Sequence, residues 1–224
     1  MKKRNILIPV FMGITFCLIT ITGIRFEQSL LRMVPLYVSL VIALLQSRVN
    51  RYAPLIGSIN SILYAAVYFH YHLYASAIYA IAVSCPVQLA TFILWCRHPW
   101  KSSTLLKRLT SRQRIVLAAA TVIVWCVACF ALSGTSAKYR EIDTAVTVLG
   151  IAATILTLLS YCEYTVLMIA GGSLSIILYL CMLKDTPEQI TYLEFSVYSL
   201  ICQIFACRQV SVLYQEQRKE ESLC

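Results

Sequence analysis

Charged residues are scarce in this sequence. Asp, Glu, Lys and Arg make up 13% of the 224 residues, whereas a soluble domain carries about 25%. Hydrophobic residues make up 59%, and the mean hydropathy is +0.75. A surface so poor in charge would aggregate in water but suits lipid, so this composition excludes a soluble globular domain. The length is enough for seven or eight membrane spans of about 20 residues each.

Histidine is rare as well, and catalytic motifs are missing from the sequence. The three histidines, His70, His72 and His98, are too scattered to predict a metal site. The chain contains no H-E-x-x-H, G-x-S-x-G or Walker sequence. Its cysteines lie mostly in apolar runs, where a free thiol behaves as a small hydrophobic side chain. An enzyme acting on lipid or peptide is therefore disfavoured, and we expect no metal or cofactor.

Apolar runs between charged breaks predict an all-α integral membrane protein with about eight transmembrane helices. The expected helices span residues 6–24, 30–46, 54–69, 73–95, 115–133, 142–159, 164–183 and 190–206. The first run follows a basic N-terminus, as in a signal peptide. It is long for a signal peptide and lacks a small-x-small cleavage site, so an uncleaved helix is expected.

The distribution of basic residues predicts the orientation. With the N-terminus inside, the inner segments hold 14 of the 19 Lys and Arg residues and the outer segments hold 5. This excess predicts both termini in the cytoplasm and an even number of spans. The net charge of +9 then follows from topology. No soluble segment is large enough for a nucleic-acid-binding surface, although the basic segment 97–114 is expected to touch anionic lipid.

An internal repeat links the two halves of the chain. Residues 57–64 read G-S-I-N-S-I-L-Y, and residues 172–179 read G-S-L-S-I-I-L-Y. The same offset places Ser84 on Ser199 and Gln88 on Gln203. The matched helices are the third and seventh, so they run in the same direction through the membrane. This predicts a parallel 3+1+3 repeat with one extra N-terminal helix, and a site at the repeat interface near mid-membrane.

The repeat divides the chain into five parts. We expect an extra N-terminal helix at residues 1–29 and a first three-helix repeat at 30–96. A basic cytoplasmic loop and linker helix follow at 97–141, then a second three-helix repeat at 142–212 and a cytoplasmic tail at 213–224.

Polar side chains inside the predicted spans form stripes. Such groups are costly in hydrocarbon unless they are paired or line a wet cavity. Gln88 and Trp95 share one face of the fourth helix, and Asn60 and Tyr64 share one face of the third. Amides can grip a polar ligand group, and aromatic rings suit a flat or cationic ring. The alternative is hydrogen bonding between helices, which is the better interpretation for single Ser or Thr residues.

Other residues of the predicted helices have expected roles as well. We expect the repeat partners Gln88 and Gln203 to face one central cavity, and Tyr179 to repeat the role of Tyr64. Tyr192 is expected in the interfacial aromatic belt. Gly57 and Gly172 are expected to allow close helix packing.

The segment 50–64, N-R-Y-A-P-L-I-G-x-x-N-x-x-x-Y, is followed by a helix that ends Gln88…Trp95. Together they resemble the first half of the PnuC-type vitamin transporters. Glu163-Tyr164, Tyr179 and the block around Tyr198 resemble the second half. The resemblance implies a SWEET-like fold and facilitated uptake of a vitamin or nucleoside, chiefly nicotinamide riboside. It implies that a cytoplasmic kinase traps the substrate.

The candidate substrate-binding residues are Asn60, Tyr64, Gln88, Trp95, Tyr164, Tyr179, Tyr198 and Gln203. We also expect a homo-oligomer in a bacterial plasma membrane.

One departure from the family pattern bears on the substrate. After the acidic residue, nicotinamide riboside members tend to have W-x-x-W-x-x-x-N, whereas Thr165, Met168 and Gly172 stand there in this chain. Weak nicotinamide riboside binding is therefore expected, and thiamine, riboflavin or another flat vitamin is open. The alternative function is a substrate-binding membrane subunit for such a vitamin that needs an energising ATPase partner.

Overall fold

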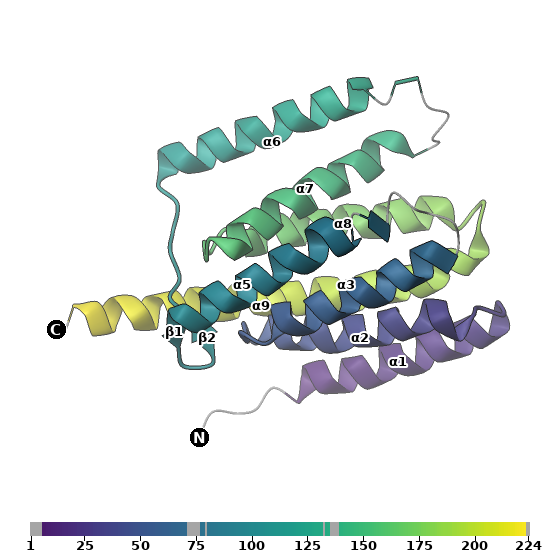
Figure 1. The fold of residues 1–224 in the computed structure, drawn as a ribbon, viewed down its shortest axis with the longest axis horizontal. Coiled ribbons are helices and arrows are strands. Elements are labelled where there is room, and N and C mark those ends of the chain that lie inside the picture. The colour runs from purple at the N-terminus through teal and green to yellow at the C-terminus, as the bar shows by residue number, and fades with distance from the viewer. Residues whose placement is uncertain (1–5, 71–76, 79, 132, 135–138, 223–224) are drawn as a thin grey trace.

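The computed structural model describes residues 6–70, 77–78, 80–131, 133–134 and 139–222. Its helices run roughly parallel to one long axis (Figure 1). They are α1 (Leu7–Arg25), α2 (Leu30–Ser47), α3 (Ala53–His70), α5 (Cys85–Arg97), α6 (Ser111–Ala131), α7 (Arg140–Leu158), α8 (Tyr164–Met182) and α9 (Ile190–Glu221). A π-helical turn, η1 (Ala80–Ser84), leads into α5, and a 3-10 turn, η2 (Pro187–Gln189), leads into α9. A hairpin of β1 (Pro99–Trp100) and β2 (Ser103–Thr104) follows α5.

The eight predicted helices are confirmed, with two qualifications. The start of the fourth predicted helix lies partly outside the described residues. The last helix was predicted to end at Ala206, but α9 continues to Glu221. Within the described residues, seven helices are long and apolar enough to cross a membrane. The helix outside that set is α3, whose buried face carries the polar residues Ser58, Asn60 and Ser61.

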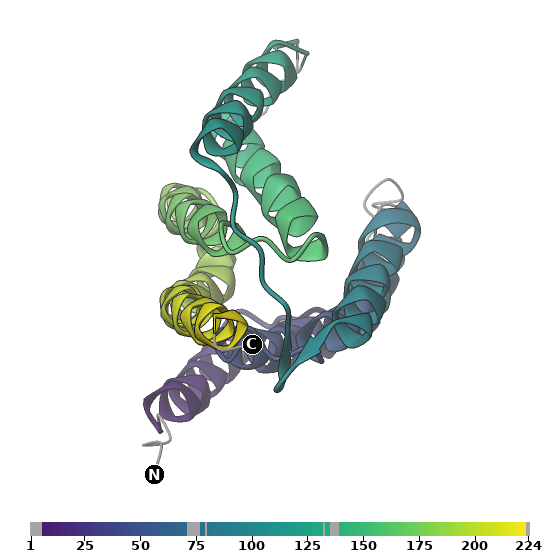
Figure 2. The same ribbon diagram turned by 90° about the vertical axis from the view of Figure 1, so that its left-hand side faces the viewer.

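Six helices form a ring. Around it, α2 packs against α3, α3 against α5, α5 against α7, α7 against α8, α8 against α9, and α9 against α2. Helix α1 lies outside the ring against α2 and α9, and α6 lies outside it against α7 (Figure 2). No residue of α6 is buried.

The ring consists of the two predicted repeats. The first unit is α2, α3 and η1–α5, the second is α7, α8 and α9, and α6 connects them. The units meet at two seams, α2 with α9 and α5 with α7. Each seam joins the first helix of one unit to the last helix of the other. The seams are therefore equivalent when the units are exchanged, as a parallel repeat requires.

One end of the ring is crossed by an ordered segment that the sequence indicated only as a basic loop. Residues 103–109, here called the strap, run from β2 toward α6 across this end (Figure 2). The side-chain amide of Gln217 accepts from the Leu106 amide at 3.0 Å and donates to the Thr104 carbonyl at 3.0 Å. Lys107 pairs with Tyr161 as a parallel bridge. The strap is thus held by the late turns of α9 and by the α7–α8 connection.

The late turns of α9 also hold the β1–β2 hairpin. Lys101 Nζ lies 2.6 Å from Glu216 Oε2, and this hydrogen bond raises the pKa of Lys101. Residues 213–221, predicted as part of a tail, are therefore helical because they dock the hairpin and the strap.

Candidate functional site

The two repeats contain the same local arrangement of glycine, glutamine and serine. Gln88 on α5 lies against Gly57 on α3, where an added Cβ would meet its Oε1. Gln203 on α9 lies in the same way against Gly172 on α8. Each glycine lets the neighbouring helix bring an amide onto its backbone, because a Cβ there would collide with the amide oxygen.

A serine one turn before each glutamine completes the arrangement. Gln88 Nε2 lies 3.1 Å from Ser84 Oγ, and Gln203 Nε2 lies 3.1 Å from Ser199 Oγ. These pairs stand at the offset that the sequence repeat predicted, with matching distances. The two amides therefore occupy equivalent places in the two units.

The two amides differ in how well they are satisfied. Gln88 Nε2 also donates to Ser61 Oγ at 2.8 Å, and Ser61 in turn bonds Ser84 at 2.9 Å. The repeat partner of Ser61 is Ile176, which offers no hydroxyl. Gln203 Oε1 is buried and has no hydrogen-bond partner among the described residues. The second unit thus presents a buried acceptor that its own chain does not satisfy.

Tyrosines from both units gather toward the end of the ring opposite the strap. The rings of Tyr64 and Tyr68 stack with centroids 6.0 Å apart, and those of Tyr179 and Tyr192 stack 5.8 Å apart. The phenols of Tyr179 and Tyr192 lie close enough to act electrostatically on Tyr64. These four residues, here called the tyrosine cluster, are Tyr64 and Tyr68 of α3, Tyr179 of α8 and Tyr192 of α9.

Asn60 lies one helical turn before Tyr64 on α3. It is 5% exposed, and its Nδ2 donates to Ser39 Oγ at 2.9 Å. Ser39 also lies near the Tyr64 side chain. Asn60 Oδ1 is buried without a partner among the described residues. Two of the predicted site amides thus carry an unpaired carbonyl oxygen.

Tyr192 lies at the start of α9, and its ring takes part in contacts between helices. Its ring stacks on Tyr179, and the Arg32 guanidinium lies 5.1 Å from the ring centroid. Arg32 also approaches Glu188 at 3.8 Å. Tyr192 is therefore part of an inter-unit contact between α2 and α9, because Arg32 attracts the face of its ring.

Two other predicted residues lie at the strap end. Trp95 is 3% exposed and donates from Nε1 to the Thr157 carbonyl at 3.0 Å, across the α5–α7 seam. Tyr164 is buried in the same apolar cluster. That inner cluster comprises Val49, Trp95, Leu106, Leu156, Tyr164, Val210 and Leu213. Leu106 of the strap thus belongs to a cluster with side chains from four ring helices and from the α2–α3 connection.

Tyr198 lies in a different cluster, where α9 meets α1 and α2. It is 1% exposed, and its hydroxyl lies 3.4 Å from the Leu40 carbonyl. Its position favours a packing role between helices.

The family-pattern positions are filled by the chain's own side chains. Thr165 is 2% exposed and bonds the Cys162 carbonyl at 3.0 Å, and Met168 packs against the inner cluster. Gly172 faces the Gln203 amide. A ring at 168 would need space that the inner cluster occupies, and an amide at 172 would displace Gln203.

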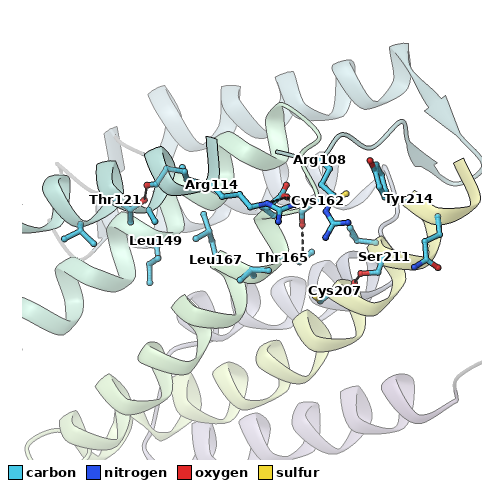
Figure 3. Close-up of a pocket in the computed structure, with 17 residues that line it drawn as sticks. Arg108, Arg114, Thr121, Leu149, Cys162, Thr165, Leu167, Cys207, Ser211 and Tyr214 are labelled. Carbon is cyan, nitrogen blue, oxygen red and sulfur yellow. Dashed lines mark hydrogen bonds and ion pairs between the residues drawn. The ribbon is translucent and has the colours of Figure 1, made fainter. Parts of the chain in front are cut away.

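A cavity of about 630 Å³ lies outside the ring near the strap end (Figure 3). It is bounded by α6, α8 and α9, and a second cavity of about 310 Å³ adjoins the strap. Neither is lined by any of the eight predicted substrate-binding residues. Cys162 lines the larger one, and burial raises the pKa of its thiol to about 11.

Comparison with known proteins agrees with this architecture. The chain matches the family model described as "Nicotinamide mononucleotide transporter" over residues 29–209, which covers both repeats. Its fold is similar to the crystal structure of the vitamin B3 transporter PnuC, with a TM-score of 0.75 and 23% identity, covering 94% of this chain and 91% of that one. No curated protein matches the sequence significantly.

Proposed function

This chain belongs to the nicotinamide mononucleotide transporter family, and from that membership we propose that it is a facilitated-diffusion carrier for a flat vitamin or nucleoside. Family membership makes it a multi-pass membrane transporter and not an enzyme. The proposed substrate is of the vitamin B3 type or a related flat vitamin, and it passes along the axis between the two three-helix units.

The unpaired carbonyl oxygen of Gln203 is the observation that supports this most directly. A buried acceptor without a partner costs about 1–3 kcal/mol. A ligand that donates an amide or hydroxyl hydrogen there recovers this free energy. The symmetric amide of Gln88 and the tyrosine cluster then supply a second polar contact and ring faces for a flat group.

Passive transport is supported by the surroundings of Glu194. This carboxylate lies about one turn inside α9, so it is a candidate to bind a coupling proton or cation. Its Oε2 accepts from Thr22 Oγ1 of α1 at 3.0 Å. Helix α1 lies outside the ring, so Glu194 is turned away from the proposed path.

Substrate choice is proposed to differ from that of typical nicotinamide riboside carriers. Thr165, Met168 and Gly172 stand in place of two rings and an amide. We expect weak nicotinamide riboside binding and tighter binding of thiamine, riboflavin or another flat vitamin.

The test is a ligand screen on the purified protein by thermal shift, followed by uptake in liposomes. Binding raises stability by RT ln(1 + [L]/Kd), so the best ligand gives the largest shift. A low-micromolar Kd for nicotinamide riboside, about −8 kcal/mol, would contradict the substrate proposal.

The liposome experiment also distinguishes a facilitated carrier from the alternative function, a binding subunit that needs an ATPase partner. A facilitated carrier equilibrates its substrate when the chain is reconstituted alone. A substrate-binding subunit that needs an ATPase partner binds the ligand but does not move it.

We further propose that the strap end faces the cytoplasm of a bacterial cell. The predicted inner connections, the start of α1 and the end of α9 lie at one end of the molecule (Figure 1). A cytoplasmic kinase would then trap the delivered substrate, and copies of the chain would associate as a homo-oligomer. Reporter fusions at Cys224 and within residues 133–143 should report opposite sides of the membrane. Fusions on the same side would contradict this orientation.

A further inference from the structure

The cavity between α6, α8 and α9 lies apart from the proposed transport path, and of the three positions that depart from the family pattern only Thr165 lines it. It lies outside the ring, because α6 packs on the outer side of α7. One wall is a single face of α6, formed by Arg114, Leu117, Ala118, Thr121 and Val122. The spacing i, i+3, i+4, i+7 and i+8 places these side chains in one stripe.

The stripe runs from the polar end of the molecule into the membrane-spanning part of α6. From residue 114 to residue 122 the helix rises about 12 Å. Below Arg114 the cavity is walled mainly by aliphatic side chains, among them Leu149 on α7 and Val166 and Leu167 on α8. Such a wall offers nothing to a small water-soluble anion, but it accommodates a hydrocarbon chain.

The mouth of the cavity is basic. Arg114 forms an ion pair with Glu163, with Nη2 2.9 Å from Oε1, so this charge is compensated. Glu163 is occupied further by the Leu109 amide, at 3.2 Å from Oε2. Arg108 forms no hydrogen bond or ion pair within the described part of the chain, and it lines both this cavity and the smaller one beside the strap.

Figure 3 shows Arg108 and Arg114 near the strap-side part of the cavity, with Thr121 and Leu149 toward the other end. An uncompensated guanidinium above an apolar slot matches one chemical class: a phosphate group attached to an acyl chain. Arginine binds phosphate oxygens through its planar set of donors.

We propose that this cavity binds an anionic phospholipid. The phosphate lies on Arg108, with the Ser211 and Tyr214 hydroxyls of α9 beside it, and one acyl chain follows the α6 stripe past Leu117 and Val122. The lipid fills the space between α6 and the second unit. The lipid thereby packs against the linker helix α6, which has no buried residue of its own.

The test compares lipids on the full chain in detergent. Native mass spectrometry and thermal shift are measured with phosphatidylglycerol, with phosphatidylcholine, and with glycerol phosphate as the free headgroup. We expect retention of phosphatidylglycerol over phosphatidylcholine and no effect of glycerol phosphate. Equal stabilisation by glycerol phosphate would show a site for soluble anions and overturn the lipid proposal.

Three variants test whether the lipid binds in this cavity. Arg108→Gln should weaken phosphatidylglycerol binding about fivefold, because one basic side chain near anionic lipid contributes about 1 kcal/mol. Arg112→Gln is the matched control, since Arg112 is exposed on the neighbouring turn and does not line the cavity. Ala118→Trp should fill the slot and remove lipid binding with Arg108 intact.

Two results would overturn the proposal. One is equal lipid loss in Arg108→Gln and Arg112→Gln, which would indicate a diffuse charge effect. The other is a change of oligomeric state in Ala118→Trp with lipid binding unaltered, which would show that a second copy of the chain covers this groove.

Discussion

Gln203 rests its side-chain carbonyl oxygen on the backbone of Gly172, and this oxygen is buried with no hydrogen-bond partner in the described residues. Gln88 makes the same approach to Gly57, but the serines beside it satisfy its amide nitrogen twice. The two amides occupy equivalent places but differ in their hydrogen bonding. Substituting each glutamine in turn should therefore affect stability and ligand binding differently.

The first prediction concerns the two glutamines. Gln203→Leu should lower substrate affinity about five- to a hundredfold, since the ligand loses a contact of about 1–3 kcal/mol. Its melting temperature should hardly change, because the substitution removes an unsatisfied acceptor together with one bond to Ser199. Gln88→Leu should lower stability by about 1 kcal/mol, since two membrane hydrogen bonds average about 0.6 kcal/mol each. The measurements are ligand titration and thermal melting.

Normal affinity in both variants would assign the pair to helix packing and leave Asn60, Tyr64 and Tyr179 as candidates.

The second prediction concerns the glycines under these amides. Gly57→Ala and Gly172→Ala should each lower stability by about 1–3 kcal/mol, because the new Cβ meets the glutamine carbonyl. Gly150→Ala on α7 is the control, since nothing lies within 4 Å of its added Cβ. Alanine there should be neutral or favourable, by up to about 1 kcal/mol of helix propensity. Melting temperatures in detergent compare the three. The close approach would be refuted if all three variants melted together.

The third prediction concerns the clamp on the strap. Gln217→Ala removes the hydrogen bonds to Leu106 and Thr104, which are buried. The Leu106 amide should then exchange its hydrogen about five- to a hundredfold faster, because the lost bonds contribute about 1–3 kcal/mol to local stability. Gln215→Ala serves as the control, since Gln215 is exposed on the same helix. Hydrogen exchange by mass spectrometry reads residues 103–109 directly. Equal exchange in both variants would show that Gln217 does not hold the strap.

The fourth prediction concerns the Cys162 thiol. Burial raises its pKa to about 11, so only about one thiol in a thousand is ionised at pH 8. Because the thiolate is the reactive form, alkylation should be on the order of a hundredfold slower than in the unfolded chain. The rate should keep rising as the pH is raised toward 11. N-ethylmaleimide labelling read by peptide mass spectrometry provides the comparison, with exposed Cys96 as the internal reference. Equally fast labelling of Cys162 and Cys96 at pH 8 would contradict the burial.

The sequence predicted the repeat because the packing requires particular residue types at matching positions. A helix can bring an amide onto its neighbour's backbone only over a glycine, so Gly57 and Gly172 recur with Gln88 and Gln203. These four residues have a fixed offset that survives when most apolar residues between them differ. The helix count followed from apolar runs, since a lipid-facing helix needs few polar residues.

The strap could not be predicted because its bonds are non-local. Gln217 pairs with backbone groups more than a hundred residues earlier in the chain. One signal was available for the helical tail, namely Val210, Leu213 and Gln217 at helical spacing, all of which are buried. The contact between Tyr192 and Arg32 is non-local as well, since it depends on the packing of α2 against α9.

The extra helix makes the two seams unequal. Through Thr20, α1 bonds Tyr37 of α2 at 2.9 Å, and through Thr22 it bonds Glu194 of α9 at 3.0 Å. It therefore cross-links the two units at the α2–α9 seam. At the opposite edge, Trp95 spans from α5 to α7 with one hydrogen bond. When the two units separate to admit a substrate, we expect the α5–α7 seam at Trp95 to open while the α2–α9 seam stays closed.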